Sequence, residues 1–418
     1  MPNDPVPNDP VQIDGQRLWQ TIGRSSEIGR GRPGGLHRLA LSDDDRDMRD
    51  QFAAWCADTG LSVTVDAAGN MFARMAGRED LPPVTIGSHF DTTAAGGRFD
   101  GVLGVLAGLE IVRTLKDQCI VPRRPIEVIN WTNEEGTRFA PPMAASSVFA
   151  GKQSLEWLHG LKDDDGISFG DELTRTGYDG PAPVGGHPLD SYFELHIEQG
   201  PELHAKGLPL GIVTGGYSSY GMNVVFRGRT AHSGPTQMEV RQNALVGAAK
   251  FIAAINDIGW AFAPVGKTTA PRIQVWPNKP GIIPDHAEAT VDMRHANPDT
   301  TEEMVRQAHA ALATAAKEAN VTAEIVTEWR FGTERFSDDL IGLVRDSARS
   351  MGVEPLDMLS QAGHDAYHLS AVTPTVLLFS PCIDGISHNE AEDVEYEPTI
   401  TAVNVMLQAV LARANRPD

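Results

Sequence analysis

Short, mainly apolar runs alternate with amphipathic stretches in the first third of the chain. Residues 42–60 begin with a serine and three aspartates, place apolar residues at helical spacing and end on a glycine, so they predict a helix. Residues 84–88 and 126–131 predict buried strands, and residues 101–116 between them predict a helix. A strand–helix–strand order is typical of parallel strand pairs. This part therefore predicts an α/β fold with a mainly parallel central sheet.

A different pattern follows residues 207–220, which are rich in turn-forming residues. The elements it predicts are strands at 222–229, 272–276, 287–294 and 321–329 and helices at 241–258 and 301–320. Their order is β-α-β-β-α-β, which is typical of a ferredoxin-like α+β unit. After about residue 330 the α/β pattern resumes, with a buried strand at 375–379 and a last helix from residue 398.

These two patterns predict a discontinuous first domain with a second domain inserted into it. The first domain is expected at 11–212 and 330–418, and the inserted domain at 213–329. Residues 1–10 form a Pro/Asn/Asp tract without an apolar segment, so they predict a disordered extension and neither a signal peptide nor a membrane anchor.

Charge and cysteine content narrow the class of protein. The 418 residues carry a formal net charge of −21, which disfavours binding to nucleic acid and to anionic membrane surfaces. The longest apolar stretch, 102–112, is too short to span a bilayer. The three cysteines are scattered and form no C-x-x-C pair, which argues against a disulfide framework and a thiolate zinc site. We therefore expect a cytoplasmic protein.

Polar residues that are costly to bury gather at the carboxyl ends of the predicted strands, where α/β sheets place ligands. They are His89, Asp91 and Asp100; the adjacent pair Glu134 and Glu135; His196; and His388. Taken singly, such a histidine is more often a hydrogen-bonded or surface residue, and a glutamate pair is more often a solvated helix start. Together, three histidines, one aspartate and one glutamate form a ligand set that suits two zinc-like ions, with one carboxylate bridging.

The chain also resembles a known family over nearly its whole length after the N-terminal tract. This is the amidase/hydantoinase/carbamoylase branch of the co-catalytic di-zinc metallopeptidase-like superfamily. The motifs that carry the resemblance are GSHFDTTAAGGRFDGVLGV, NEEGTRF, HIEQGPEL, RGRTAHSGPTQMEVRQNAL, the PN at 277–278 followed by Arg294, AGHDA and GISHNE.

The resemblance implies a role for each candidate. The metal ligands would be His89, Asp100, Glu135, His196 and His388, with Asp100 bridging two divalent ions. Zinc would be the first expectation, with manganese, cobalt or nickel as alternatives. Asp91 would orient His89, and Glu134 would be the general base. His232, on the inserted domain, would donate to the tetrahedral oxyanion, and it commonly reaches the site from the partner subunit of a homodimer.

Substrate recognition follows in the same way. Arg294 offers a guanidinium fork that suits a carboxylate, although a rim salt bridge is the simpler interpretation of such a residue. By resemblance it would hold the substrate carboxylate, Gln199 and Asn278 would bind its polar groups, and Gly363 and Ser387 would line the pocket. The sequence departs from the family pattern at Asn243, Gly281 and Gln361, which puts the identity of the substrate in question more than the hydrolytic mechanism.

The function that the resemblance implies is metal-dependent hydrolysis of the carbamoyl C–N bond of an N-carbamoyl-L-amino acid. The products would be the amino acid, carbon dioxide and ammonia. Within the family, a β-ureidopropionase, an allantoate amidohydrolase or a ureidoglycolate amidohydrolase stays open as the alternative. An aminoacylase, a dipeptidase or a non-catalytic scaffold is less favoured, because the HIEQG and AHSGPT motifs and all five ligands are present. The inserted domain would act as a lid and a dimerisation domain.

Overall fold

The computed structural model describes residues 10–417, which form two compact units. The first unit contains residues up to Thr214 together with 335–358 and those from 363 onward. The second contains residues 215–334 and the short segment 359–362. The predicted N-terminal extension, residues 1–10, lies outside the described residues except for Pro10.

The first unit is built on an eight-stranded sheet. Its order is β1 (Ser62–Val65), β2 (Met71–Met75), β4 (Ile126–Trp131), β3 (Val84–His89), β5 (Ser191–Ile197), β14 (Thr375–Ser380), β6 (Gly211–Gly216) and β13 (Leu356–Ser360). The four central strands, β4, β3, β5 and β14, are parallel to one another. Antiparallel pairing is found at the flanks, where β1 pairs with β2, β2 with β4 and β6 with β14. The predicted α/β fold with a mainly parallel central sheet is confirmed.

The four central strands are buried along their whole length, as expected for parallel strands that are covered on both faces. Their registers align the strand ends: His89 pairs with Trp131, and His196 pairs with Phe379. Two of the candidate histidines therefore lie at the carboxyl edge of this sheet.

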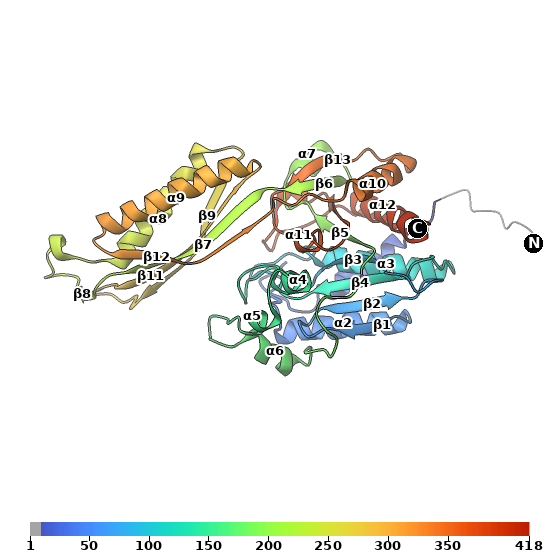
Figure 1. Cartoon of the computed structure of the whole chain (residues 1–418), viewed down its shortest axis with the longest axis horizontal. Helices are drawn as coiled ribbons and strands as arrows, with labels where there is room; N and C mark the ends of the chain where they lie inside the picture. The colour runs from blue at the N-terminus through green and yellow to red at the C-terminus, as the bar shows by residue number, and fades with distance from the viewer. Residues whose placement is uncertain (1–9, 418) are drawn as a thin grey trace, which may run out of the picture. The chain divides into compact units, whose positions relative to one another are not determined.

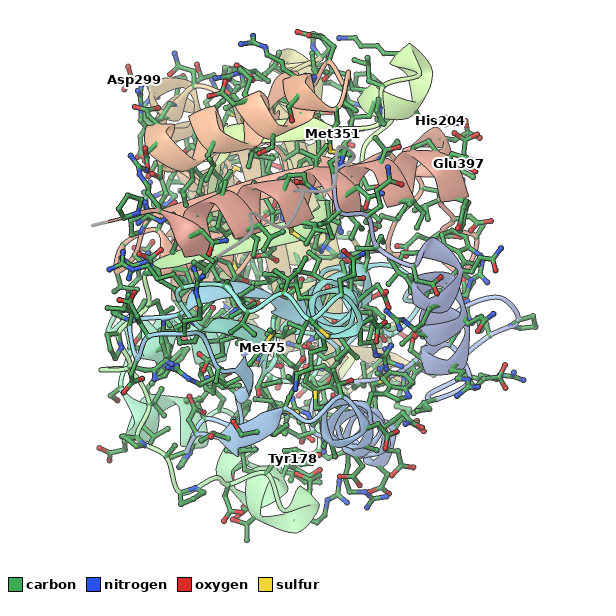
Figure 2. The ribbon with its side chains drawn as sticks, turned by 90° about the vertical axis from the view of Figure 1, so that its right-hand side faces the viewer. Met75, Tyr178, His204, Asp299, Met351 and Glu397 are labelled. Carbon is green, nitrogen blue, oxygen red and sulfur yellow. The ribbon has the colours of Figure 1, made fainter. Side chains whose placement is uncertain are left out.

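Helices cover the sheet (Figure 1). Helix α3 (Val102–Asp117) contacts β3, β4 and β5, and α12 (Tyr396–Asn415) contacts β3, β5 and β14. Figure 2 looks onto the α12 side, with Glu397 marking the first turn of that helix. The other helices are α1 (Gly15–Ser25), α2 (Asp43–Asp58), α4 (Ala144–Phe149), α5 (Leu155–His159), α6 (Phe169–Thr176), α7 (Glu202–Lys206), α10 (Asp338–Ser350) and α11 (Ala366–Leu369).

The second unit holds a four-stranded antiparallel sheet in the order β12 (Thr322–Phe331), β7 (Ser218–Arg227), β11 (His286–His295) and β9 (Lys267–Trp276). Helices α8 (Ala244–Ala261) and α9 (Pro298–Glu318) pack together against this sheet, and a short ribbon joins β8 (Ala231–His232) to β10 (Ile282–Ile283). The order of the long elements is β-α-β-β-α-β. The stretch 207–220, expected to be rich in turns, instead contains β6 and the start of β7.

One helix among residues 10–417, α8, is long and apolar enough to meet the length and composition of a membrane span. Its apolar side chains, Phe251 and Ile255 among them, belong to the core of the second unit. A core helix meets the same criteria, so this feature is weak evidence for a membrane span.

Helix α2 carries a buried ion pair that fastens it to the sheet. Ser42 caps the helix by accepting from the N–H of Asp45. The buried Arg49 guanidinium pairs with Asp45 at 2.8 Å and donates to the carbonyl of Gly69 and the hydroxyl of Thr132. Thr132 immediately follows β4, so this pair links α2 to the loop that carries two candidate glutamates.

We expect Arg49→Ala to lower the free energy of unfolding by about 3–5 kcal/mol, because it leaves the buried Asp45 carboxylate without its cation. Arg46→Ala, on the same helix, is the matched control. Arg46 pairs with Asp43 and Asp47 in an exposed position, so its loss should cost below about 1 kcal/mol. Urea unfolding of both variants measures the difference, and equal losses would contradict the role assigned to the buried pair.

Candidate metal centre

The candidate ligands lie at the carboxyl ends of four strands of the first unit, β3, β4, β5 and β14, or in the loops that follow them. His89 is the last residue of β3, and His196 is the penultimate residue of β5. Asp100 lies in the loop that leads from β3 into α3, and Glu135 lies in the loop after β4. His388 follows β14 and has a left-handed backbone conformation, with φ of 53°. The α/β topology thus brings together residues that are up to 299 positions apart in the chain.

The ligand atoms form two triads that share Asp100. In the first, the Nε2 atoms of His196 and His89 lie 3.0 and 3.9 Å from Oδ1 of Asp100. In the second, Nε2 of His388 lies 3.3 Å from Oδ2 of Asp100 and 3.4 Å from Oε2 of Glu135. Within each triad, one ligand atom from each residue lies within 4.8 Å of the others.

This donor set fits two divalent cations. Ligand atoms bound tetrahedrally to zinc at 2.0–2.2 Å are separated by about 3.3 Å, and three of the four separations above lie close to that value. Asp100 presents one oxygen to each triad, as a bridging carboxylate does. Among the described residues, Oε1 of Glu135 and Oε1 of Gln199 are buried and accept no hydrogen bond. The protein is therefore suited to bind divalent metal ions at this place.

Two backbone carbonyls fix the orientation of the buried histidines. Nδ1 of His89 lies 2.9 Å from the carbonyl oxygen of Asp91, and Nδ1 of His196 lies 2.9 Å from that of Ile197. Each ring can donate from Nδ1 and so present a free Nε2 to the centre.

The part that Asp91 plays differs in detail from the expectation. Its carboxylate lies 3.9 Å from Nδ1 of His89, whereas its backbone carbonyl makes the closer contact. The carboxylate instead accepts from the backbone N–H groups of Glu134 and Glu135, both at 3.2 Å. Asp91 therefore orients the loop of the two glutamates with its side chain and orients His89 with its main chain.

The residue after Asp100 has to be a glycine. Gly101 has φ of 67°, and a Cβ atom there would lie 2.4 Å from the imidazole of His89. A side chain at this position would meet the ligand directly, in a conformation that is strained for any other residue. The sequence Asp100-Gly101 therefore allows the backbone to pass close beside the His89 ring.

Burial and mutual repulsion shift the pKa values of the carboxyl groups in the site. Burial, with Asp365 and Glu135 nearby, raises the pKa of Glu134 well above its usual range, and burial raises the pKa of Glu135 to about 8. Burial also raises the pKa of Asp100, but its hydrogen bonds with His196 and His388 outweigh this and hold the pKa well below its usual range. Positive charge would stabilise the ionised form of these carboxyl groups, and bound metal ions would supply it.

The pKa values of the three histidines shift in different directions: that of His89 falls, and those of His196 and His388 rise. Burial lowers the pKa of His89 to about 4, so its imidazole is neutral at pH 7. The pKa of His388 rises to about 10, chiefly through the charge of Glu135. For His196, burial is outweighed by the bond to Asp100, and its pKa rises to about 9.

Two predicted substrate residues lie beside the triads. Nε2 of Gln199 donates to Oδ2 of Asp100 at 3.0 Å and lies 3.2 Å from the hydroxyl of Ser387. That hydroxyl is also 3.2 Å from Oδ2 of Asp100. Gly363 lies in the loop between β13 and α11, next to His364, whose ring centroid is 4.5 Å from that of His196.

Three further predicted residues belong to the second unit. His232 is exposed and ends β8, and Asn278 follows β9 with φ of 47°. Nε of Arg294 pairs with Asp292 at 2.6 Å, and its Nη1 donates to the carbonyl of Gln361 at 2.7 Å.

Sequence reasoning missed several carboxylates around the centre. Asp365 lies at the N-cap position of α11, yet its side chain makes no capping hydrogen bond and accepts instead from the hydroxyl of Ser146. Glu194, two residues before His196 on β5, is fully buried and accepts a hydrogen bond from the hydroxyl of Ser88. Glu392 was also missed, although it lies four residues after His388. Alternation along β5 was the one available signal for Glu194, since residues two apart share a face of a strand.

Comparisons with known proteins identify the class to which this centre belongs. The sequence profile of Peptidase family M20/M25/M40 matches residues 81–412, and the chain belongs to this family. It is 39% identical, over 98% of its own length and 99% of the relative's, to an N-carbamoyl-L-amino-acid amidohydrolase of Rhizobium meliloti.

Structural similarity places the chain more narrowly. An amidase of the hydantoinase/carbamoylase family from Burkholderia vietnamiensis superposes with a TM-score of 0.94 at 43% identity, covering 98% of this chain and 99% of that one. A more distant relative, a ureidoglycolate hydrolase of Oryza sativa, is 29% identical over 96% of this chain and 85% of its own. The predicted family is confirmed, and with it the enzyme class, a hydrolase that acts on carbon–nitrogen bonds of a small-molecule substrate.

We expect metal binding to release protons at pH 7, because a histidine must be neutral to bind a metal. In the metal-free protein the pKa values of His196 and His388 are raised to about 9 and about 10, so both are protonated at pH 7 and release that proton to the solvent when a metal binds. Metal affinity should therefore rise with pH until about pH 10, where His388 loses its proton. Calorimetric titrations in buffers of different ionisation enthalpy count the protons, and a count of zero at pH 7 would contradict this assignment.

Proposed function

We propose that the protein hydrolyses the carbamoyl group of N-carbamoyl-L-amino acids. The observation that carries the proposal is the pair of metal-suited triads that share Asp100, with the carboxylate of Glu134 beside them: its Oε2 lies 3.7 Å from Nε2 of His89. The relative from Rhizobium meliloti, which bears this activity in its name, supports the choice of substrate class.

The ligands in this proposal are the five side chains of the two triads, with Asp100 bridging. They are His89, Asp100, Glu135, His196 and His388. The mixture of imidazole nitrogens and carboxylate oxygens favours zinc, and it also accepts manganese, cobalt or nickel. When bound, the two ions polarise the ureido carbonyl and lower the pKa of a water molecule.

Glu134 is the proton carrier of the reaction. Its side chain is buried, with Glu135 next to it in the loop after β4 and Asp91 nearby in the loop after β3, and burial favours its protonated form. Positive charge at the triads shifts it back to the carboxylate, which takes the proton of the attacking water. Glu134 then delivers that proton to the leaving nitrogen. Water and the ureido acid thus give the amino acid, carbon dioxide and ammonia.

The oxyanion that forms at the attacked carbon needs a donor, and we assign this role to His232. Its side chain is exposed in the second unit, where it is free to meet a substrate or another subunit. We further propose that the second unit serves as lid and homodimer interface. Three large apolar side chains in it, those of Met238, Trp260 and Trp276, are 66–76% exposed, and such side chains commonly mark interaction surfaces.

Arg294 is our choice for the residue that binds the substrate carboxylate. Its pairing with Asp292 leaves the local charge positive, because Lys267 is the direct cross-strand neighbour of Arg294. The Lys267 ammonium contacts the side-chain oxygen of Gln361, whose backbone carbonyl accepts from Arg294. Two cations against one carboxylate favour an anionic substrate group.

The remaining contacts concern the polar end of the substrate. We assign its ureido group to Gln199, whose Oε1 is buried without a donor, and to Asn278. Ser387 and Gly363 line the same pocket. The departures at Asn243, Gly281 and Gln361 bear on which ureido acid is preferred. Asn243 caps α8 through its side chain, and Gln361 is part of the Arg294 cluster, so these two have structural roles here.

Ureidoglycolate or allantoate hydrolysis is the second candidate function. The relative from Oryza sativa, a ureidoglycolate hydrolase, is the observation in its favour. The higher identity of the relative from Rhizobium meliloti favours the N-carbamoyl amino acid. We also propose a cytoplasmic location, since Cys56, Cys119 and Cys382 are all unpaired.

The defining experiment is ammonia release from a panel of ureido acids. The protein is stripped with a chelator, reloaded with zinc or manganese, and offered N-carbamoyl-L-amino acids, N-carbamoyl-β-alanine and allantoate. We expect metal-dependent turnover, highest for the N-carbamoyl-L-amino acids. Release of an amino acid from N-acyl analogues instead would make the enzyme an aminoacylase, and highest turnover of allantoate would select the second candidate function.

Glu134→Gln should retain both metals and lose turnover by a factor of about 10²–10⁴, because the amide keeps the shape of the side chain and cannot accept the proton. Metal content and kcat are measured on the same sample. Glu156→Gln, at an exposed position of α5, is the matched control and should behave like the unaltered enzyme. Undiminished kcat in the Glu134→Gln variant would show that another group carries the proton.

A further inference from the structure

Glu392 is a buried carboxylate to which the mechanism above gives no role. It lies between the His388 loop and α12, and its side chain is 1% exposed. One oxygen, Oε1, accepts from the backbone N–H groups of Phe99 and Asp100, at 3.0 and 3.1 Å. The other, Oε2, lies 3.0 Å from the hydroxyl of Ser387.

These contacts join the two loops that meet at the bridging aspartate. Through Oε1, Glu392 holds the main chain of Asp100 itself. Through Oε2, it holds Ser387, which precedes His388 and also contacts Oδ2 of Asp100 at 3.2 Å. The Glu392 side chain therefore connects the loop of Asp100, which both triads share, to the loop of His388, which belongs to the second triad only.

The surroundings of Glu392 are closed around its carboxylate. A Cβ atom on Gly97 would lie 2.0 Å from the carboxyl carbon and from Oε1 of Glu392. The backbone at Gly97 thus passes where a side chain of any other residue would displace the carboxylate. Gly97 and Glu392, which are distant in the chain, are therefore closely packed against each other.

We propose that Glu392 is a positioning residue that sets the spacing between the two triads by fixing Asp100 relative to His388. It touches neither substrate nor ligand nitrogen; it acts through Asp100 and Ser387. A bridging carboxylate must aim one oxygen at each ion, so a small shift of its backbone would misalign both. The proposal rests on the proposed metal centre. Glu392 reaches the first triad through Asp100 alone but reaches the second through both Asp100 and Ser387, so its loss should weaken most the ion held by Asp100, Glu135 and His388.

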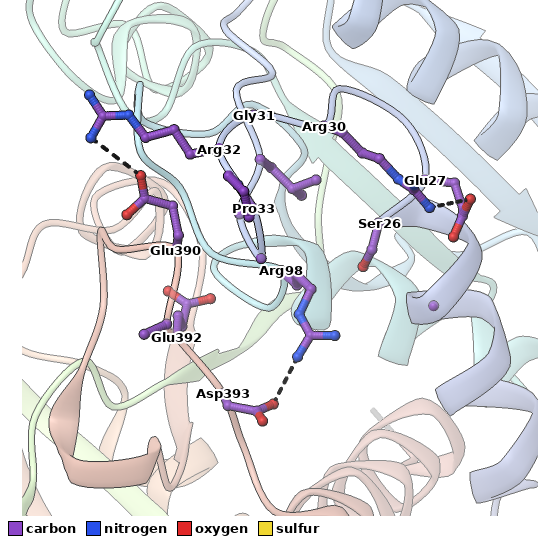
Figure 3. A pocket seen from close by; sticks show the side chains of 15 residues that line it. Ser26, Glu27, Arg30, Gly31, Arg32, Pro33, Arg98, Glu390, Glu392 and Asp393 are labelled. Atoms are coloured by element: carbon purple, nitrogen blue, oxygen red, sulfur yellow. Dashed lines mark hydrogen bonds and ion pairs between the residues drawn. The ribbon is translucent and has the colours of Figure 1, made fainter.

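Glu392 also lines a cavity of about 750 Å³. Figure 3 shows the side chains around it. Glu392 and the neighbouring carboxylates Glu390 and Asp393 line it, and these neighbours pair with Arg32 at 3.6 Å and Arg98 at 3.1 Å. Asp393 is thus a carboxylate next to Glu392 in sequence and in the same cavity wall. It bonds to Arg98 and to the N–H of Val394, and so it provides a matched control.

The test compares Glu392→Gln, Glu392→Ala and Asp393→Asn by metal titration of the chelator-stripped full chain. Glutamine can accept from both N–H groups and can donate to Ser387, so Glu392→Gln should bind both ions like the unaltered protein. Glu392→Ala should bind the second ion about 10–100-fold more weakly. Asp393→Asn should leave both affinities unchanged.

Two results would overturn the proposal. One is unaltered affinity for both ions in Glu392→Ala. The other is an equal loss in Glu392→Gln and Glu392→Ala, which would show that the charge matters and the hydrogen bonds do not. Should Glu392→Ala fail to fold, Ser387→Ala decides, because it cuts the same link and should weaken the second ion alone; unaltered affinity there would refute the link.

Metal affinity separates this proposal from the proposed function. Two ions bound without turnover of any ureido acid would remove the proposed substrate class and leave the role of Glu392 intact. Turnover of N-carbamoyl amino acids by a Glu392→Ala enzyme with unaltered affinity for both ions would support the function and refute the role of Glu392.

Discussion

The concentration of buried carboxylates at one edge of the sheet is the constraint on which the first unit depends. They are Asp91, Asp100, Glu134, Glu194, Asp365 and Glu392, with Glu135 partly buried beside them. Each costs several kcal/mol to desolvate as an isolated charge, and their repulsion adds to that cost. Two features offset this cost. Backbone N–H groups and hydroxyls donate hydrogen bonds to the carboxylates, and the five candidate ligands are arranged so that cations could bind between them. The same carboxylates that destabilise the metal-free edge thus suit it to divalent metal ions.

Close packing then decides which atoms face the cations. The central strands are covered on both faces, so their ends can carry polar groups only where specific partners exist. Backbone carbonyls turn the two imidazole rings, and Gly97 and Gly101 let the backbone pass close to Glu392 and His89. The order of the centre therefore comes from main-chain geometry as much as from the ligands. This explains how residues spread over nearly three hundred positions reach one centre.

Much of this could be predicted from the sequence, for physical reasons that differ between elements. Strand β4 was predicted at its observed bounds, because a short apolar run between turn signals has few alternatives. Strand β6 was missed because glycines at 211, 215 and 216 resemble a turn. The ligand candidates were accessible because strand ends are sites of ligand binding in α/β folds. Glu392 could not be predicted in this way. Nothing in its acidic local sequence shows that its carboxylate is buried, or that it accepts from Asp100, which lies 292 positions earlier in the chain.

The proposed function assigns different groups to the two units. The first unit concentrates negative groups suited to metals, whereas the second contributes the cations Lys267 and Arg294 and the exposed His232. Under the proposed function, a ureido acid would offer its carbonyl to the groups of the first unit and its carboxylate to those of the second. If both ends must be bound for hydrolysis, a molecule lacking the carboxylate loses the interactions with the second unit that position the carbonyl. Under the proposed function, substrate selection would then rest on the inserted unit, and hydrolytic power would rest on the sheet edge of the unit whose sequence it interrupts.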